Sequence, residues 1–463
     1  MPDPIRAAMD ALQAAIPCAK ASPARPRFHF TAPSHWLNDP NGTIYHNGYY
    51  HLFYQHHPFS DEWGPMHWGH ARSTDLLHWE HLPIALYPEG DGVENGIFSG
   101  CVVINKHGQP MAFYTRANHP KPEGTEDDFT QAVAFGSADL LKWEKREAPL
   151  LTREGPAADY LRDWRDPFIF HAEERTFLTV GMTGKGLPIY EATDGSLLNW
   201  EHKGVLHDDD AECPNFFEVD GHWVYLWSPF DSVGYAIGGF DTKTLKFTPE
   251  THGRYDWSEF KHSNYYATNH LYAPDGRSIL FGWIRGWKPG MGWNGCMGIP
   301  REVQIGADGR LRTPPIEEMN SLRQPLMDIT TLELSTGSTT MQFDPSQQYE
   351  LSCELILGNA AKMGFGLCTS PQGISDHALW LQEDGIHLDG VHIQLDEYQP
   401  SKPVAVRLFI DHAVAELFVD DGRYCAVRAF HDYIPANTRL KVFADGENTV
   451  LRGLQVWKIV TTQ

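Results

Sequence analysis

Hydrophobic and polar positions between about residues 30 and 320 recur in a fixed order. Five times, a short polar motif is followed by an apolar strand, a turn with Gly or charged residues, and a second strand rich in aromatic and aliphatic residues. We expect these second strands at 48–55, 108–115, 175–181, 221–227 and 276–283. Three of the units continue with a Leu-Leu-x-Trp-Glu element, at 75–80, 139–144 and 196–201. Repeated units of four short antiparallel strands around an axis predict a β-propeller, whose blade cores would hold the three Trp side chains.

After Pro314-Pro315 the pattern changes to strand-like alternation without the Trp element, at 349–357, 404–410, 414–419 and 440–443. This alternation is typical of an antiparallel β-sandwich. We therefore predict an all-β chain: a leader at 1–27, a five-bladed β-propeller at 28–320 and a C-terminal β-sandwich at 321–463. In the leader, apolar residues at helical spacing predict a short helix over residues 4–16, ended by Pro17 and packed on a neighbouring element.

The start of each propeller unit is where chemistry is expected. The first strand of a propeller blade is the innermost one, so residues just before it should face the central cavity. These positions hold Asn38-Asp39-Pro40, Phe98-Ser99-Gly100, Arg165-Asp166-Pro167, Glu212-Cys213-Pro214 and Tyr265-Tyr266-Ala267. Three of the five carry a carboxylate, and these carboxylates would converge on one pocket.

The first of these motifs, Trp-Leu-Asn-Asp-Pro-Asn-Gly at 36–42, has a clear local geometry. Pro40 pushes Asp39 toward extended backbone, and Asn41-Gly42 favour a tight turn, so Asp39 should be held just before a strand at 43–45. Taken alone, such a motif is more often a plain surface turn. The other motifs in order give it weight as a functional position.

Composition and charge narrow the class of partner. The 463 residues include 37 Lys+Arg and 60 Asp+Glu, a formal net charge of −23, which disfavours nucleic acid and anionic membranes and suits a neutral or cationic small molecule. Seven scattered cysteines without a Cys-x-x-Cys pair argue against a disulfide framework and for a reducing compartment. The first 22 residues lack a secretory pattern, so we expect a cytoplasmic protein.

Carboxylates, amides and Trp side chains around one cavity suit a carbohydrate, because polar groups bind hydroxyls and Trp faces stack on the apolar sides of sugar rings. Candidate sugar contacts are Asn38, Gln55, Trp63, Trp68 and Trp283. Two carboxylates opposed across a glycosidic bond are the machinery of glycoside hydrolysis.

The set of motifs resembles glycoside hydrolase family 32, the invertase-like β-fructofuranosidases. It comprises Trp-Leu-Asn-Asp-Pro-Asn-Gly, Trp-Gly-Pro-Met-His-Trp-Gly-His-Ala at 63–71, Phe-Ser-Gly, Arg-Asp-Pro and Glu-Cys-Pro, with Ala-Glu-Leu-Phe-Val-Asp-Asp-Gly at 415–422 in the sandwich. The resemblance implies a retaining double displacement, with Asp39 as nucleophile, Glu212 as general acid and base, and Asp166 stabilising the transition state. Substrate contacts would come from Asn38, Gln55, Trp63, Phe98, Ser99, Arg165, Tyr266 and Trp283. The mechanism requires no cofactor or metal.

These roles set electrostatic expectations. Asp39 should stay ionised through donors from Asn38, the local turn and Arg165, while nearby acids, among them residues 208–210, should help Glu212 keep its proton. We predict that the carboxyl groups of Asp39 and Glu212 lie about 5–5.5 Å apart, the separation typical of retaining enzymes.

Several alternatives stay open at this level. Sucrose is the leading substrate; transfer to another sugar, trimming of levan or inulin, and sucrose 6-phosphate bound through Arg285 or Lys288 are the rivals, beside a sugar-binding propeller without catalysis. Blade five lacks the Asp-Phe-Tyr-Ala-Pro-Gln run frequent in bacterial family members, which leaves leaving-group specificity open. The pairs His56-His57 and His67-x-x-His70 are read as polar pocket or packing residues rather than metal ligands, and Cys213 as a buried neighbour. No oligomeric state is predicted.

Overall fold

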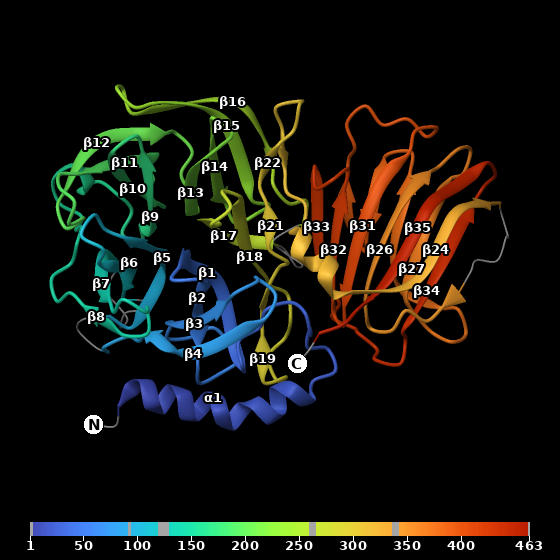
Figure 1. The fold of residues 1–463 in the computed structure, drawn as a ribbon, viewed down its shortest axis with the longest axis horizontal. Helices are drawn as coiled ribbons and strands as arrows, with labels where there is room; N and C mark the ends of the chain where they lie inside the picture. The colour runs from blue at the N-terminus through green and yellow to red at the C-terminus, as the bar shows by residue number, and fades with distance from the viewer. Residues whose placement is uncertain (1–2, 91–93, 119–128, 259–264, 336–341, 462–463) are drawn as a thin grey trace.

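The fold is described from a computed structural model, in which residues 3–90, 94–118, 129–258, 265–335 and 342–461 are placed. A wheel of sheets, blue to yellow, lies beside a two-layered body of strands, orange to red (Figure 1). The predicted five-bladed propeller followed by a β-sandwich is confirmed. Within the described residues, no helix has the length and apolar character needed to cross a bilayer.

Five antiparallel sheets of the described chain form the blades. Blade one contains β1 (His35–His46), β2 (Tyr49–His57), β3 (His67–Ser73) and β4 (Trp79–Leu86). Blade two contains β5 (Gly96–Ile104), β6 (Pro110–Ala117), β7 (Thr130–Gly136) and β8 (Trp143–Lys145). Blade three contains β9 (Arg165–Ala172), β10 (Arg175–Gly181), β11 (Leu187–Ala192) and β12 (Trp200–His207), with η1 (Gly155–Ala157) before it. Blade four contains β13 (Glu212–Val219), β14 (His222–Ser228), β15 (Gly234–Asp241) and β16 (Lys246–Arg254).

Blade five closes the wheel. It contains β17 (Tyr265–Tyr272) and β18 (Ser278–Ile284), with the short strands β20 (Cys296–Met297) and β21 (Arg301–Glu302) both paired to β18. Between β18 and β20 in the chain, the short strand β19 (Trp293–Asn294) leaves blade five and pairs in parallel with the start of β1 in blade one. A small hairpin of β22 (Gln304–Ile305) and β23 (Leu311–Arg312) and then η2 (Glu317–Leu322) lead onward. All five expected second strands are confirmed as β2, β6, β10, β14 and β18.

Every innermost strand carries the same irregularity. In β1, β5, β9, β13 and β17, two residues stand opposite one residue of the second strand, which is a β-bulge. The extra residues come from Asn38-Asp39, Phe98-Ser99, Asp166-Pro167, Cys213-Pro214 and Ala267-Thr268. Bulges re-aim side chains, so five equivalent bulges direct five motifs toward one axis.

The bulge corrects one prediction. We placed Asp39 just before a strand and Asn41-Gly42 in a tight turn, but the strand begins at His35 and contains the whole motif. Gly42 does adopt the expected positive φ, 51°, yet a second register shift absorbs it inside the strand. Proline is tolerated there because a bulge leaves a backbone position outside the ladder.

The Leu-Leu-x-Trp-Glu elements open the fourth strands of blades one to three. In each, the first Leu is buried with a positive φ, and the Trp indole N–H donates to its carbonyl at 2.9–3.1 Å. The three Trp side chains, at 79, 143 and 200, are half-buried and pack against the blade cores. They are packing residues, as predicted.

The sandwich has two six-stranded sheets among the described residues. One runs β24 (Arg323–Leu334), β35 (Thr449–Ile459), β26 (Gln348–Ile356), β31 (Val404–Asp411), β32 (Val414–Val419) and β33 (Tyr424–Ala429). The other runs β25 (Gln342–Phe343), β34 (Arg439–Asp445), β27 (Lys362–Thr369), β28 (Ser375–Gln382), β29 (Gly385–Leu388) and β30 (Val391–Ile393). The four strands expected from alternation are confirmed as β26, β31, β32 and β34.

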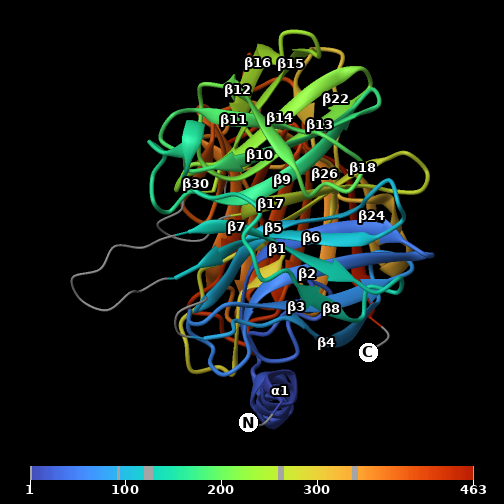
Figure 2. The same ribbon diagram turned by 90° about the vertical axis from the view of Figure 1, so that its left-hand side faces the viewer.

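The leader helix is longer than predicted. The helix α1 (Pro4–Ala21) continues through Pro17, where we expected it to end, and lies along the rim of the wheel (Figure 2). Proline removes one helical hydrogen bond but does not forbid the helix when tertiary contacts hold both sides. Here Leu12 packs on Ile84 before the proline, and Ala19 joins the propeller core after it.

A buried charge network joins propeller and sandwich. Arg301 of β21, fully buried, donates to Asp256 at 3.2 Å and to Glu416 of β32 at 2.9 Å. His29 contacts Glu416 and Asp411 through its two ring nitrogens, each at 2.9 Å. Burial alone would lower the pKa of His29, but these two carboxylates raise it to about 9. The interface is thus a chain of compensated charges.

Candidate active site

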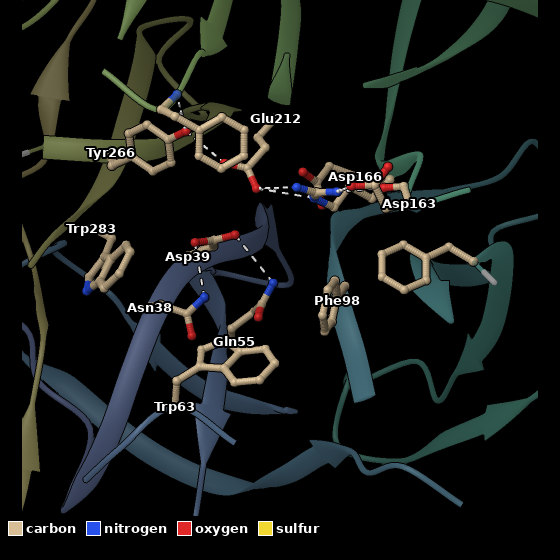
Figure 3. A pocket seen from close by; sticks show the side chains of 13 residues that line it. Asn38, Asp39, Gln55, Trp63, Phe98, Asp163, Asp166, Glu212, Tyr266 and Trp283 are labelled. Carbon is tan, nitrogen blue, oxygen red and sulfur yellow. Dashed lines mark hydrogen bonds and ion pairs between the residues drawn. The ribbon is translucent and has the colours of Figure 1, made fainter. Parts of the chain in front are cut away.

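A cavity of about 300 Å³ opens at the propeller axis. Figure 3 shows Asp39 and Glu212 facing each other across it, with Asp166 to one side. The three carboxylates come from the bulged starts of β1, β13 and β9, so the predicted convergence is what the structure shows. The cavity is lined by Asn38, Asp39, Gln55, Trp63, Phe98, Phe129, Asp163, Arg165, Asp166, Glu212, Phe230, Tyr266 and Trp283.

Asp39 is held by four donors, one of which is the Cys213 thiol at 3.5 Å from Oδ2. Ser99 Oγ donates to its Oδ2 at 2.5 Å, and Gln55 Nε2 reaches the same oxygen at 3.3 Å. Asn38 Nδ2 donates to Oδ1 at 3.1 Å, and the Asn38 amide is itself oriented by the Trp36 indole N–H at 2.7 Å. Burial raises the pKa of Asp39, while the hydrogen bond from Ser99 opposes that rise.

Arg165 does not contact Asp39, contrary to our expectation. Its Nη2 and Nε donate to Glu212 Oε1 at 2.8 and 3.2 Å, and its Nη1 binds Asp163 at 3.1 Å. The guanidinium therefore compensates the general-acid candidate. Arg165 is the last paired residue before the bulge of β9, whereas Asp166 lies within the bulge.

Tyr266 caps the other oxygen of Glu212. Its hydroxyl lies 2.7 Å from Glu212 Oε2 and 2.8 Å from the Ser228 carbonyl oxygen, and it accepts the backbone N–H of Phe230. Burial and the Glu212 charge raise the pKa of Tyr266 far above its usual range, so it stays a donor. Asp208 and Asp209 are exposed, and Asp210 binds Thr183 and Gly184. The acidic run that we expected to act on Glu212 faces elsewhere.

Asp166 is buried among charged groups. Burial raises its pKa to about 7, with Arg165 opposing the rise and Glu212 and Asp39 adding to it. Its φ of 65° is a strained value that the bulge imposes, and its Oδ2 accepts the backbone N–H of Cys213 at 3.0 Å. Cys213 is a buried thiol, and burial raises its pKa well above the usual range, so it is no nucleophile.

The other predicted contacts divide into three groups. Trp63, Phe98 and Trp283 line the cavity, and Ser99 stands behind Asp39. Trp68 is wrong as a sugar platform: it is fully buried and donates its indole N–H to the Phe98 carbonyl.

Phe129, Asp163 and Phe230 line the cavity without having been predicted. Asp163 stands two residues before Arg165, so proximity to that motif could have indicated it; the two Phe residues carry no sequence signal.

The histidine pairs lie apart from the cavity lining. His56 Nδ1 contacts the Trp36 carbonyl, His67 Nδ1 the Pro65 carbonyl, and His70 stacks on Phe53. Burial lowers the pKa of His56 to about 3 and of His67 to about 4, so both are neutral. These contacts agree with packing roles.

A five-bladed propeller with opposed carboxyl groups at its axis is the architecture of a glycoside hydrolase. Residues 29–315 match the N-terminal domain of glycosyl hydrolases family 32, and residues 384–458 match the C-terminal domain of that family. The chain belongs to glycosyl hydrolase family 32.

Relatives of known activity span nearly the whole chain. A sucrose-6-phosphate hydrolase of Escherichia coli is 31% identical over 94% of both chains. A raffinose invertase of Escherichia coli is 30% identical over 94% of this chain and 95% of its own. A Bombyx mori β-fructofuranosidase mutant, solved in complex with sucrose, superposes with a TM-score of 0.79 at 26% identity, covering 99% of each chain.

Proposed function

We propose that the protein hydrolyses terminal, unphosphorylated β-D-fructofuranosides with retention of configuration, and that sucrose is its leading substrate. One observation carries the proposal: Asp39 and Glu212 oppose each other across the cavity with Asp166 beside them. The relatives with fructoside-cleaving activity support the same reaction.

Asp39 is the proposed nucleophile. Its Oδ attacks the fructose anomeric carbon as the bond to the leaving sugar breaks, and a covalent fructosyl-enzyme ester forms. Water then attacks that carbon and releases the carboxylate, so two displacements restore the starting configuration. We expect carboxyl groups about 5–5.5 Å apart for this pair. The Ser99 and Gln55 donors stabilise the negative charge that returns when the ester is cleaved.

Glu212 is the proposed acid and base, and its two neighbours suit both of its states. When Glu212 is ionised, the Tyr266 hydroxyl and the Arg165 guanidinium donate to it. When Glu212 is protonated, the Tyr266 hydroxyl can turn its proton to the Ser228 carbonyl at 2.8 Å and accept from Glu212 instead. The proton delivered to the leaving oxygen in step one is recovered from water in step two.

Asp166 is the proposed partner of the fructose hydroxyls. Its raised pKa of about 7 means that it can donate or accept near neutrality, and its rigid bulge fixes the direction of the carboxyl. A carboxylate near the oxocarbenium-like transition state stabilises positive charge.

The cavity favours a substrate without phosphate. Among the described lining residues, the single cationic side chain is Arg165, already engaged by Glu212 and Asp163. Arg285 lies half-buried over the Trp283 ring at 5.7 Å, and Lys288 is exposed; neither lines the cavity. A sugar phosphate entering there would meet Asp163 without a new counter-charge. Sucrose 6-phosphate, the substrate named for one relative, is therefore the second choice.

The first experiment is a product assay of the purified protein on sucrose, sucrose 6-phosphate, inulin and levan. We expect kcat/KM on sucrose to exceed that on sucrose 6-phosphate, and free fructose to be the main product. Proton NMR of the first product formed should show the β anomer. An α anomer would refute Asp39 as nucleophile, and dominant oligosaccharide products would favour the transferase alternative.

The second experiment separates catalysis from binding. Glu212→Gln should lower kcat on sucrose by about 10²–10⁴-fold because the leaving glucose needs a proton. The same variant should still release a first equivalent of fluoride rapidly from β-fructosyl fluoride, whose leaving group needs no proton, before the slower, base-assisted hydrolysis of the ester limits turnover. Glu218→Gln, an exposed position of the same strand, is the matched control and should leave both rates unchanged. Unchanged sucrose turnover in Glu212→Gln would refute the assignment.

We also infer a reducing, intracellular location. The seven cysteines of the chain are all free thiols, and six of them are buried. Proteins of oxidising compartments seldom carry this many unpaired thiols. Fractionation of the native host, with the protein found outside the cells, would contradict this inference.

A further inference from the structure

One group of potential metal ligands in the described chain lies in the sandwich, away from the carboxylates of the propeller. Asp384, His387 and His392 present donor atoms that all lie within 4.8 Å of one another. Asp384 stands in the turn between β28 and β29, His387 on β29 and His392 on β30. We propose that these three side chains form a binding site for a divalent transition metal, with Zn²⁺ as the fitting ion.

The geometry of the donors matches a tetrahedral ion. His387 Nε2 lies 2.9 Å from Asp384 Oδ1, and His392 Nε2 lies 3.7 Å from Asp384 Oδ2. Ligands bound to Zn²⁺ at about 2.0–2.1 Å in a tetrahedron are roughly 3.3–3.4 Å apart, which falls between these two distances. Both Nε2 atoms thus lie beside Asp384; that of His392 contacts the Asp384 backbone carbonyl oxygen at 3.1 Å, and an ion shared with the carboxylate would replace this contact and leave a fourth position for water.

The two imidazoles are oriented by the sheet before any ion arrives. His387 pairs directly with Trp380 on one side and with His392 on the other. Its ring stacks on the Trp380 indole at 4.9 Å and on the His392 ring at 4.4 Å, with interplanar angles of 2° and 8°. Stacking in parallel planes holds the two rings side by side, and a rotation of the more exposed His392 ring would turn its Nε2 toward an ion shared with His387.

Access and charge also suit an ion. The side chain of Asp384 is 54% exposed and that of His392 44%, so an ion can arrive from solvent, while His387 is 13% exposed. The formal charge of −23 attracts cations to the whole molecule.

A bound ion would fasten the edge of one sandwich sheet. In the described part of that sheet β30 is the outermost strand, joined to the rest through β29 alone (Figure 2 labels β30). An ion held by the turn, by β29 and by β30 would link three successive chain segments. Edge strands are the part of a sheet most open to foreign pairing, so this link would protect a vulnerable element.

The test is a calorimetric titration of the full chain, first stripped with EDTA, with ZnCl₂ at pH 7.5. We expect one Zn²⁺ per chain, no binding of Mg²⁺ because imidazole suits softer metals, and slower amide hydrogen exchange in β29 and β30 when Zn²⁺ is present. His387→Gln and His392→Gln should each weaken Zn²⁺ binding by at least about tenfold. His107→Gln, an exposed histidine in the propeller, should bind like the parent.

Three outcomes would overturn the proposal. These are no Zn²⁺ binding at 100-fold molar excess over protein, binding that survives in both His variants, and binding without any change of exchange in β29 and β30. Thermal unfolding of the variants in EDTA should equal that of the parent, which shows that lost binding is not lost folding. Should His387→Gln fail to fold, the more exposed His392→Gln still decides the question.

Discussion

The propeller axis and the propeller–sandwich interface are both buried clusters of carboxylates around an arginine, but they are balanced in opposite ways. At the interface, Arg301 and His29 together face three acids; they lower the pKa of Glu416 despite its burial, although burial still raises the pKa of Asp256. At the axis, Arg165 alone faces a group that includes Asp39, Asp166 and Glu212, and burial raises the pKa of the first two. The interface therefore contributes stability through its charges, whereas the site keeps reactive protons at a cost in stability.

The largest effect on stability should follow from breaking the interface. Glu416→Gln leaves Arg301 and His29 buried without one of the carboxylates that compensate their charges. We expect a loss of about 3–5 kcal/mol in the free energy of unfolding. Urea titration measures it. The control is Glu354→Gln, which removes an exposed pair with Arg452 and should cost less than about 1 kcal/mol. Equal losses in the two variants would refute the contrast.

Removing the Asp166 carboxylate from the site should raise the free energy of unfolding, the opposite of the effect expected at Glu416. Because the pKa of Asp166 rises from 3.8 to about 7 on folding, its contribution to stability is present below about pH 4 and lost as the pH rises through 7. Asp166→Asn should therefore raise the free energy of unfolding, and this gain should be larger at pH 8 than at pH 5 by on the order of 1 kcal/mol. The same substitution should sharply lower the rate of sucrose hydrolysis. Melting temperatures at both pH values measure the gain in stability.

The exposed Asp159→Asn, just before the same strand, should change neither quantity. A destabilised Asp166→Asn protein at pH 8 would show that the carboxylate holds the fold together instead of straining it.

The interface also predicts that the free energy of unfolding falls at alkaline pH. The pKa of His29 is raised from 6.5 to about 9 on folding, so its stabilising charge is fully present below pH 6.5 and is lost as the pH rises through 9. The free energy of unfolding should fall between pH 6.5 and 9.5 in the parent. His29→Gln should show a shallower fall over that range, by roughly 1 kcal/mol or more. Parallel slopes in the two proteins would contradict the network.

The smallest effect is expected from the acidic run before Glu212. Asp208 and Asp209 point into solvent, where charges are screened, so replacing both with Asn should change kcat/KM on sucrose by less than about twofold. A tenfold loss, or a shifted pH profile, would restore the sequence-based idea that these acids act on Glu212.

How far the sequence could predict the site depended on the kind of information needed. Repetition located the five inner strands, because each unit carries its own motif and an aromatic second strand. The partner of Arg165 was not predictable, since it depends on the side to which a bulge turns each side chain. Trp68 looked like Trp63 in sequence, but Trp68 lies on the buried strand β3, whereas Trp63 lies in the loop before that strand and is 44% exposed. The end of α1 was misplaced because proline's local effect was weighed without the packing of Leu12 and Ala19.

The parallel pairing of β19 with β1 has a consequence for synthesis. Trp293 aligns with His35, so the strand that carries Asp39 acquires its second neighbour only after most of the wheel has left the ribosome. A nascent chain, or a fragment truncated ahead of residue 293, would hold Asp39, the proposed nucleophile, on a strand paired on one side only, with β2. We therefore expect activity to begin only when the last blade has closed the wheel.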